Sequence, residues 1–257
     1  MKNILILASH EGASNFDSVG RGYTYSSSEE IAKDINAVAR ACIEQGWGVY
    51  AFNIKAKENP ATFSWYGNFL DKGIKPIQKE EIKSILDGVQ GVILLGLAAK
   101  AGTQEAFLDN TLYDYAIYDY KIDGQRKGAL GICKTFFDGN GIPVLMSSGC
   151  KAACQEAEEE GIKERVVTKT AQEGWRNGAN CRPVKEVHEE LYQTAKRALV
   201  NAQRFAKTQK LVTVEIEFIR EDYLENFAYK NGGFERVDAR TLKKTVEIDS
   251  EIGRVLV

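Results

Sequence analysis

The hydrophobic pattern of this chain switches repeatedly between that of a buried strand and that of an amphipathic helix. Residues 2–8 form a nearly continuous apolar run, which is typical of a strand covered on both faces. Apolar residues then recur at helical spacing from Ile31 to Ile43, and residues 47–54 and 91–97 form two further apolar strands. This alternation predicts an α/β fold with a mostly parallel central sheet flanked by helices.

The second half of the chain continues the pattern into a smaller C-terminal α+β portion. Helical spacing predicts helices over residues 128–137, over 150–160 and after Pro183, and residues 142–146 form another buried strand. Residues 211–219 alternate between apolar and polar, which predicts a half-exposed strand near a sheet edge.

Length suggests one globular unit that needs neither a disulfide nor a structural metal. A chain of 257 residues can bury most of its apolar surface. We interpret residues 1–257 as a single domain, with a possible subdivision into a core (1–165) and a C-terminal subdomain (166–257).

Charge and composition argue against several classes of partner. The formal net charge is −2, which gives no electrostatic reason to expect nucleic acid or an anionic membrane. The most apolar internal stretch, residues 92–99, is far shorter than the ~20 residues of a membrane helix. Five irregularly spaced cysteines predict reduced thiols and a cytoplasmic location. The sequence has no P-loop or dinucleotide-binding motif, so we expect no nucleotide cofactor.

Several short segments occur in an order and spacing found in a known enzyme family. The first strand ends in Ser9-His10-Glu11-Gly12, and the second ends near Asn53. Three later segments continue the series, at residues 95–103, 143–157 and 235–241. Together they resemble the zinc D-aminopeptidases of bacterial dipeptide-transport operons. The resemblance implies a D-aminopeptidase-like fold, amide-bond chemistry and a ring-shaped homo-oligomer.

The positions that match the family's dinuclear zinc ligands carry mostly other residue types. The Asp and Glu of the first strand correspond to Ser9 and Glu11, the two histidines to Lys55 and Ala98, and the helix-start Glu to Ala129. Zinc needs roughly three or four N, S or O ligands at fixed geometry, and one carboxylate does not supply them. The resemblance therefore implies a lost zinc site, and we expect no metal or other cofactor.

Cys150 is the candidate nucleophile in place of the metal. It follows an apolar strand and begins a predicted helix, whose N-terminus favours a thiolate. The alternative is a buried cysteine without chemistry, since free cysteine is among the most buried residue types. Cys154 lies four residues later on the same helix face and aligns with the apolar stripe, which predicts a structural role.

His10 and Glu11 are the candidate general bases, at the end of the first strand, where ligands bind in open α/β sheets. Neighbouring strand residues point to opposite faces, so the alternative for His10 is a hydrogen-bonded core histidine. The family's further catalytic histidine falls near Asp109 or Asn110. His188 lies among charged residues of the long helix, which predicts a rim position without chemistry.

Ser9, Asn53, Lys55 and Lys100 are the candidate substrate-binding residues. The two lysines could supply positive charge to a substrate carboxylate or an oxyanion. The alternative for both is a solvated surface position, which is usual for lysine.

Three hypotheses for function remain open at this point. The first is a metal-independent enzyme that acts on a small amide, peptide or amino-acid derivative through Cys150 with His10 or Glu11. The second is a catalytically inactive homologue that binds an amino-acid or peptide ligand or serves a scaffold role in an assembly. The third is a D-aminopeptidase with a metal site rebuilt around His10 and Glu11. We expect a small-molecule substrate or ligand and no nucleic acid or membrane partner, and the resemblance implies a homo-oligomer.

Overall fold

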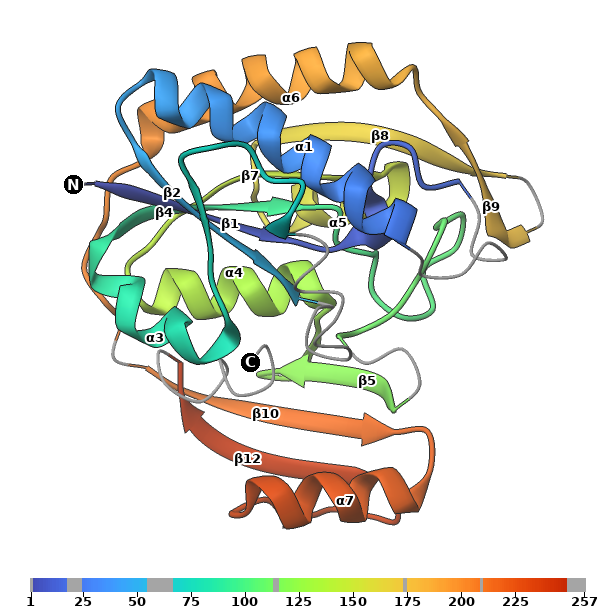
Figure 1. Cartoon of the computed structure of the whole chain (residues 1–257). Coiled ribbons are helices and arrows are strands. Elements are labelled where there is room, and N and C mark those ends of the chain that lie inside the picture. The colour runs from blue at the N-terminus through green and yellow to red at the C-terminus, as the bar shows by residue number, and fades with distance from the viewer. Residues whose placement is uncertain are drawn as a thin grey trace.

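The structure is a computed structural model that describes residues 2–17, 25–54, 67–112, 116–172, 175–208 and 210–248. The elements of these residues are arranged in two β-sheets with helices packed on them (Figure 1). Within the described residues, every helix is too short or too polar to span a membrane.

The central sheet contains seven strands of the described chain, in the order β3-β2-β1-β4-β7-β8-β9. Their bounds are β1 Asn3–Ala8, β2 Gly48–Asn53, β3 Ile74–Pro76, β4 Val89–Leu95, β7 Val144–Cys150, β8 Glu164–Gln172 and β9 Trp175–Cys181. Neighbouring strands pair in parallel, except that the edge strand β9 is antiparallel to β8. The predicted α/β class with a mostly parallel central sheet is therefore confirmed.

Helices cover both faces of this sheet, which is why its middle strands read as continuous apolar runs. The helices are α1 Tyr25–Glu44, α3 Ile82–Ile85, α4 Ala129–Gly139, α5 Lys151–Glu159 and α6 Val184–Ala198. Short 3-10 segments are η1 His10–Gly12, η4 Lys79–Glu81, η5 Leu86–Gly88 and η6 Leu199–Asn201. Helices α1 and α6 pack against each other on one face, and α4 and α5 lie together on the other (Figure 1).

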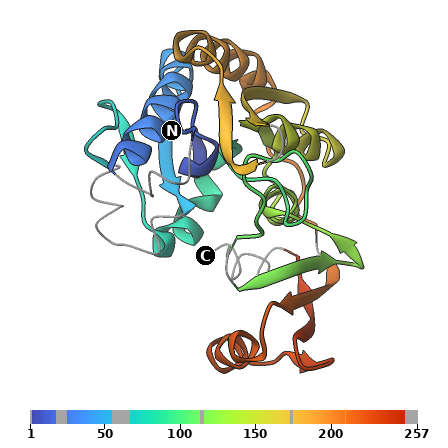
Figure 2. The same ribbon diagram turned by 90° about the vertical axis from the view of Figure 1, so that its right-hand side faces the viewer.

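The second sheet is antiparallel and lies apart from the central one (Figure 2). Its order is β11-β12-β10-β5-β6, with β5 Ile117–Ile122, β6 Gln125–Arg126, β10 Leu211–Phe218, β11 Glu235–Arg236 and β12 Thr241–Glu247. Helix α7, Glu221–Asn231, packs on β10 and β12. A division after residue 165 does not follow the sheets, because β8 and β9 complete the central sheet while β5 and β6 belong to the second.

The alternating pattern of residues 211–219 forms the predicted strand β10, but its expected edge position is wrong. β10 lies between β12 and β5, with Val212, Val214 and Ile216 buried. The alternation reflects one buried and one solvated face, which an inner strand of an antiparallel sheet also has.

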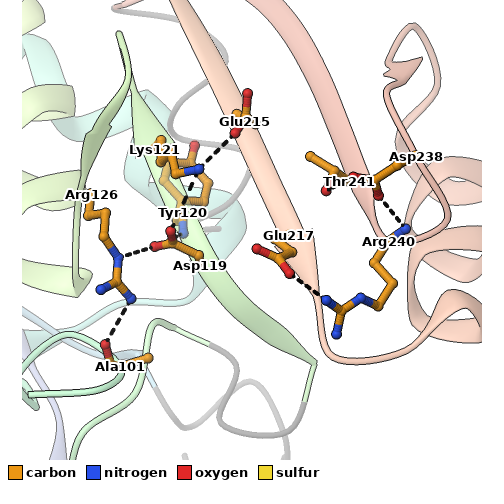
Figure 3. A network of polar contacts seen from close by, with 10 residues as sticks. All are labelled: Ala101, Asp119, Tyr120, Lys121, Arg126, Glu215, Glu217, Asp238, Arg240 and Thr241. Carbon is orange, nitrogen blue, oxygen red and sulfur yellow. Dashed lines mark hydrogen bonds and ion pairs between the residues drawn. The ribbon is translucent and has the colours of Figure 1, made fainter.

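Polar contacts on the second sheet connect it to the loop that follows β4 (Figure 3). Arg126 Nε donates to Asp119 Oδ1 at 2.8 Å, and its Nη2 donates to the Ala101 carbonyl at 3.3 Å. Lys121 Nζ bonds Glu215 Oε1 at 2.9 Å across β5 and β10. The second sheet thereby supports the loop after β4, which lies at the carboxyl ends of the central strands.

The order of the central strands reverses between β1 and β4. The chain proceeds from β1 to β2 and β3 on one side, and from β4 to β7 and β8 on the other. In open α/β sheets, ligands bind outside the carboxyl ends of the strands at such a reversal. The turn η1 after β1 and the loop after β4 occupy this position.

Two glycines allow η1 to lie directly on the end of β4. Gly12 N donates to the Gly96 carbonyl at 2.8 Å, and Ser9 N donates to the Leu95 carbonyl at 2.8 Å. A Cβ on Gly12 would lie 2.5 Å from the Gly96 Cα, and a Cβ on Gly96 would lie 2.2 Å from the Ser9 carbonyl oxygen. Gly96 also has a φ of +69°, which side chains rarely adopt.

Replacing Gly12 with alanine should therefore destabilise the fold. We expect the Gly12→Ala variant to lose about 2 kcal/mol or more of its free energy of unfolding, because the added methyl group meets backbone that cannot move freely. Denaturant unfolding measures this loss. Gly67→Ala is the control, since its added Cβ would have Pro76 Cγ at 3.9 Å as its nearest contact. Equal stability of Gly12→Ala and the wild type would contradict the close approach.

Candidate functional site at the ends of β1, β4 and β7

Glu11 is the centre of a buried polar cluster on the η1 turn. Its side chain is part of a residue only 2% exposed. Asn110 Nδ2 donates to Glu11 Oε1 at 2.9 Å, and Ser9 Oγ donates to Glu11 Oε2 at 3.2 Å. Asn110 is held in place by its backbone N–H, which bonds the Ala99 carbonyl at 2.9 Å. The residue near the family's catalytic histidine thus contacts Glu11 as a neutral amide.

His10 and Glu11 lie in a 3-10 turn, residues 10–12, and their side chains have different partners. The His10 ring is buried and packs edge-on against Phe16, with the ring centroids 6.3 Å apart. Phe16 packs in turn against Phe107 at 5.8 Å. The structure therefore places His10 beside an aromatic group and Glu11 beside Asn110.

Lys169, on β8, is a fully buried cation that the sequence analysis did not single out. Its ammonium group donates to the carbonyls of Phe16 and, at 3.4 Å, of Glu11. It also lies 4.7 Å from the centroid of the Phe107 ring and 5.5 Å from that of Phe16. Burial lowers the pKa of Lys169 to about 8.

A β-bulge in β8 lies where Thr168 and Lys169 contact the η1 turn. The register with β7 shifts between Gly149 and Cys150, so Thr168 has no opposite partner of its own. Thr168 Oγ1 donates to the Gly12 carbonyl at 3.0 Å, while Lys169 reaches the carbonyl before it. No simple periodicity of the sequence indicates this bulge.

Cys150 is the last residue of β7 and the N-cap of α5, and it is buried. The predicted position at a helix start is confirmed, although the strand extends four residues further than expected. Cys150 pairs in register with Lys169 on β8. Cys154 lies beneath it, with its thiol 3.4 Å from the Val166 carbonyl, and burial raises its pKa to about 12. These contacts support the structural role expected of Cys154.

The candidate substrate-binding residues have different surroundings. Ser9 and Asn53 are buried at the ends of β1 and β2. The Lys100 ammonium group contacts Glu159 on α5 at 3.5 Å, and no contact joins it to Glu11 or Asn110 within the described residues. Lys55 lies outside the described residues.

His188, which the sequence analysis interprets as a rim residue without chemistry, contacts residues of two other segments. Its Nε2 lies 3.0 Å from Asp34 Oδ1 and 3.4 Å from Ser14 Oγ, and Asp34 is fully buried. Ser14 donates to the same carboxylate from both its hydroxyl and its backbone N–H. Both His188 contacts use the same ring nitrogen, whereas the histidine of a Ser-His-Asp triad uses one nitrogen for the serine and the other for the aspartate. The cluster is therefore not arranged as a triad. It joins α1 and α6 to residues 13–17.

The comparison with known families places the chain among peptidases. The profile of the D-aminopeptidase family matches residues 72–256, more than half of the chain. The chain belongs to the D-aminopeptidase family. No curated protein sequence matches it.

One solved structure of this family has a similar fold. It is the zinc-dependent D-aminopeptidase DppA from Bacillus subtilis, described as a self-compartmentalizing protease. The TM-score is 0.80 at 18% sequence identity, over 98% of this chain and 95% of that chain. The predicted D-aminopeptidase-like fold is confirmed.

The donor set around Glu11 does not fit the zinc of the D-aminopeptidase family. Within the described ranges, no group of three or more His, Cys, Asp or Glu residues could hold a metal ion. Ala98 and Ala129 have no donor side chain, and the Glu11 carboxylate already accepts bonds from Asn110 and Ser9. Zinc requires about four ligands. A site rebuilt around His10 and Glu11 lacks a third such ligand in this part of the chain.

Glu156, on α5, holds the loop after β4 at this D-aminopeptidase-like site. Its Oε2 accepts a 2.6 Å bond from the Lys100 backbone N–H, and its Oε1 has no hydrogen-bond partner among the described residues. Gly128 leaves room for this oxygen, since a Cβ there would lie 2.4 Å from it. Burial raises the pKa of Glu156 to about 7.

The elevated pKa predicts a pH-dependent stability that Glu156→Gln should remove. The folded protein binds this proton more tightly than the unfolded chain, whose value is near 4.5. The stabilisation is therefore complete below pH 4.5 and is lost as pH rises through about 7, by at most about 3 kcal/mol.

Denaturant unfolding between pH 4.5 and 8 tests this prediction. Glu156→Gln should match the wild type at the acidic end and exceed its stability at pH 8, because the amide keeps the Lys100 bond without a charge. Glu159→Gln is the control, since the Glu159 side chain is 69% exposed. A wild-type profile parallel to that of Glu156→Gln would refute the prediction.

Proposed function

We propose that the chain is a peptidase-like hydrolase that cleaves an amide bond of a small peptide or amino-acid derivative without a metal ion, with Cys150 as nucleophile. The observation that carries the proposal is the position of Cys150, at the carboxyl end of β7 and the first turn of α5. A helix N-terminus favours the thiolate form, and the edge formed by strand carboxyl ends is where α/β enzymes bind ligands. Family membership supports the amide chemistry.

The proposed reaction has two half-reactions. The Cys150 sulfur attacks the amide carbon, the C–N bond breaks, and the leaving nitrogen takes a proton as the amine departs. A water molecule then attacks the thioester, gives a proton to a base, and releases the carboxylic acid and the free thiol. His10 and Glu11, on η1, are the proposed groups that donate and accept these protons.

Substrate binding in this proposal involves the polar groups beside η1. Ser9 and Asn53 are buried at the ends of adjacent parallel strands, where their side chains can bond an amide or an amino group. Lys55 and Lys100 remain candidates for binding a substrate carboxylate, although Lys100 would have to leave Glu159 to do so.

Turnover of small amides by the Cys150→Ser variant tests the nucleophile. We expect purified wild-type protein to hydrolyse members of a panel of D- and L-aminoacyl anilides and dipeptides in the presence of a chelator. Cys150→Ser should lose at least about a hundredfold in rate, because a hydroxyl is a much weaker nucleophile than a thiolate at neutral pH.

Cys154→Ser is the matched control, since this thiol lies on the same helix and donates hydrogen bonds to the backbone carbonyls of Gly149 and Val166. Its rate should stay close to that of the wild type once equal folding is verified by thermal unfolding. Undiminished turnover by Cys150→Ser, or turnover that zinc restores after chelation, would exclude the proposal.

A second candidate function is ligand binding without catalysis. It is favoured by the burial of the candidate residues, because Ser9, Glu11, Asn110 and Cys150 are each at most 5% exposed. In that case the panel would show no turnover, while amino acids or dipeptides would raise the melting temperature. Detectable hydrolysis by metal-free protein would eliminate this candidate.

We also propose that the chain self-associates and functions in the cytoplasm. DppA is described as a self-compartmentalizing protease, and the similar fold supports an equivalent assembly here. The five free cysteines support a reducing compartment.

A further inference from the structure

The loop after β4 forms a closed unit at the carboxyl ends of the central strands. Its two ends lie side by side, since the Asn110 backbone N–H donates to the Ala99 carbonyl at 2.9 Å. Within the loop, the Gly102 N–H bonds Asp109 Oδ2 at 2.7 Å. Compact loops whose ends meet in this way are often functional. We call residues 99–111 the 99–111 loop.

Two side chains of the 99–111 loop cover the η1 turn. Asn110 Nδ2 donates to Glu11 Oε1 at 2.9 Å. Phe107 is buried, packs edge-on against Phe16 and lies over the Lys169 ammonium group, 4.7 Å from the ring centroid. The Glu11 carboxylate is buried in this arrangement. A substrate that contacts it therefore requires a neighbouring segment to move.

Glu156 on α5 is the buried polar anchor of this loop. Its Oε2 accepts a 2.6 Å bond from the Lys100 backbone N–H. The other contacts of the loop's first residues are the bond from Arg126 to the Ala101 carbonyl (Figure 3) and the ion pair of Lys100 with Glu159. The Arg126 and Glu159 side chains are 48% and 69% exposed, so water competes for both contacts. The bond to Glu156 lacks this competition.

The charge on Glu156 depends on whether the loop covers it. Burial of the carboxyl group raises its pKa to about 7; Lys100 opposes this rise, and Glu160 and Glu159 on the same helix add to it. Lys127, which precedes α4, pairs with Glu160 at 2.8 Å. A carboxylate at Glu156 would gain hydration if the loop lifted, whereas a neutral carboxylic acid would gain little.

We propose that the 99–111 loop is a lid over the η1 turn and that Glu156 is its latch, which keeps the lid closed while its carboxyl group carries a proton and favours opening once the proton is lost. The closed form binds this proton more tightly than the open form, so a rise in pH through neutrality favours opening. Asn110 leaves Glu11 together with the loop. Glu156 is a positioning residue, because it touches the lid and no reacting group. The inference rests on the proposed function only for its consequence for substrate, since the motion can be measured without turnover.

Hydrogen exchange of the Asn110 backbone N–H, followed by NMR, tests the latch. Its protection factor, which corrects for the pH dependence of the exchange chemistry, should fall about tenfold or more between about pH 5.5 and 7.5 in the wild type. Lys169, under the loop, stays mostly protonated in this range because its pKa is about 8. Glu156→Gln should keep the acidic wild-type value at every pH. Glu159→Gln is the control and should retain most of the fall.

A wild-type protection factor that does not change with pH would overturn the proposal, whether or not Glu156→Gln folds. Exchange in low concentrations of denaturant separates lid opening from global unfolding. A local opening exposes little surface, so exchange of Asn110 should be insensitive to denaturant, whereas that of Ile6 in β1 should increase with it. Equal denaturant dependence of the two amides would also contradict the lid.

The lid and the proposed nucleophile fail in distinguishable ways. If Asn110 exchange follows the charge of Glu156 but Cys150→Ser keeps full turnover, the lid stands and the nucleophile is wrong. If Cys150→Ser loses turnover while Asn110 exchange is the same in the wild type and Glu156→Gln at every pH, the nucleophile stands and the lid is wrong.

Discussion

The η1 turn lies on the end of β4 because neither Gly12 nor Gly96 has a Cβ. This contact leaves room for two backbone hydrogen bonds, from Ser9 to Leu95 and from Gly12 to Gly96. The turn is thereby fixed at the point where the strand order reverses. This position buries the Glu11 side chain and turns it toward the loop after β4. The contacts of the Glu11 carboxylate with Asn110 and Ser9 depend on this placement.

The charged groups of the site are satisfied by hydrogen bonds from and to other groups of the protein. A carboxylate at Glu11 is accommodated by the Asn110 amide and the Ser9 hydroxyl, and the Lys169 cation by backbone carbonyls. DppA, which has a similar fold, is described as zinc-dependent. In this chain the Glu11 carboxylate is occupied by hydrogen bonds, and Ala98 and Ala129 have no side chain that could bind a metal ion beside it.

Much of the central sheet could be predicted from the sequence, because strands covered on both faces produce continuous apolar runs such as residues 2–8. Strand β8 could not, since Glu164–Gln172 mixes charged and apolar residues around a bulge. For the same reason Lys169 is indistinguishable in the sequence from a solvated lysine. The Glu11–Asn110 contact depends on the path of a loop, and the orientation of Lys100 toward Glu159 depends on where α5 ends; neither has a periodic signal.

The most direct test of this account is anomalous diffraction at the zinc edge from crystals grown with excess zinc. The account predicts no zinc peak within bonding distance of the Glu11 carboxylate, and Asn110 Nδ2 in contact with Glu11 Oε1. A zinc ion bound to Glu11, with Asn110 displaced, would contradict the central claim that protein groups have replaced the metal.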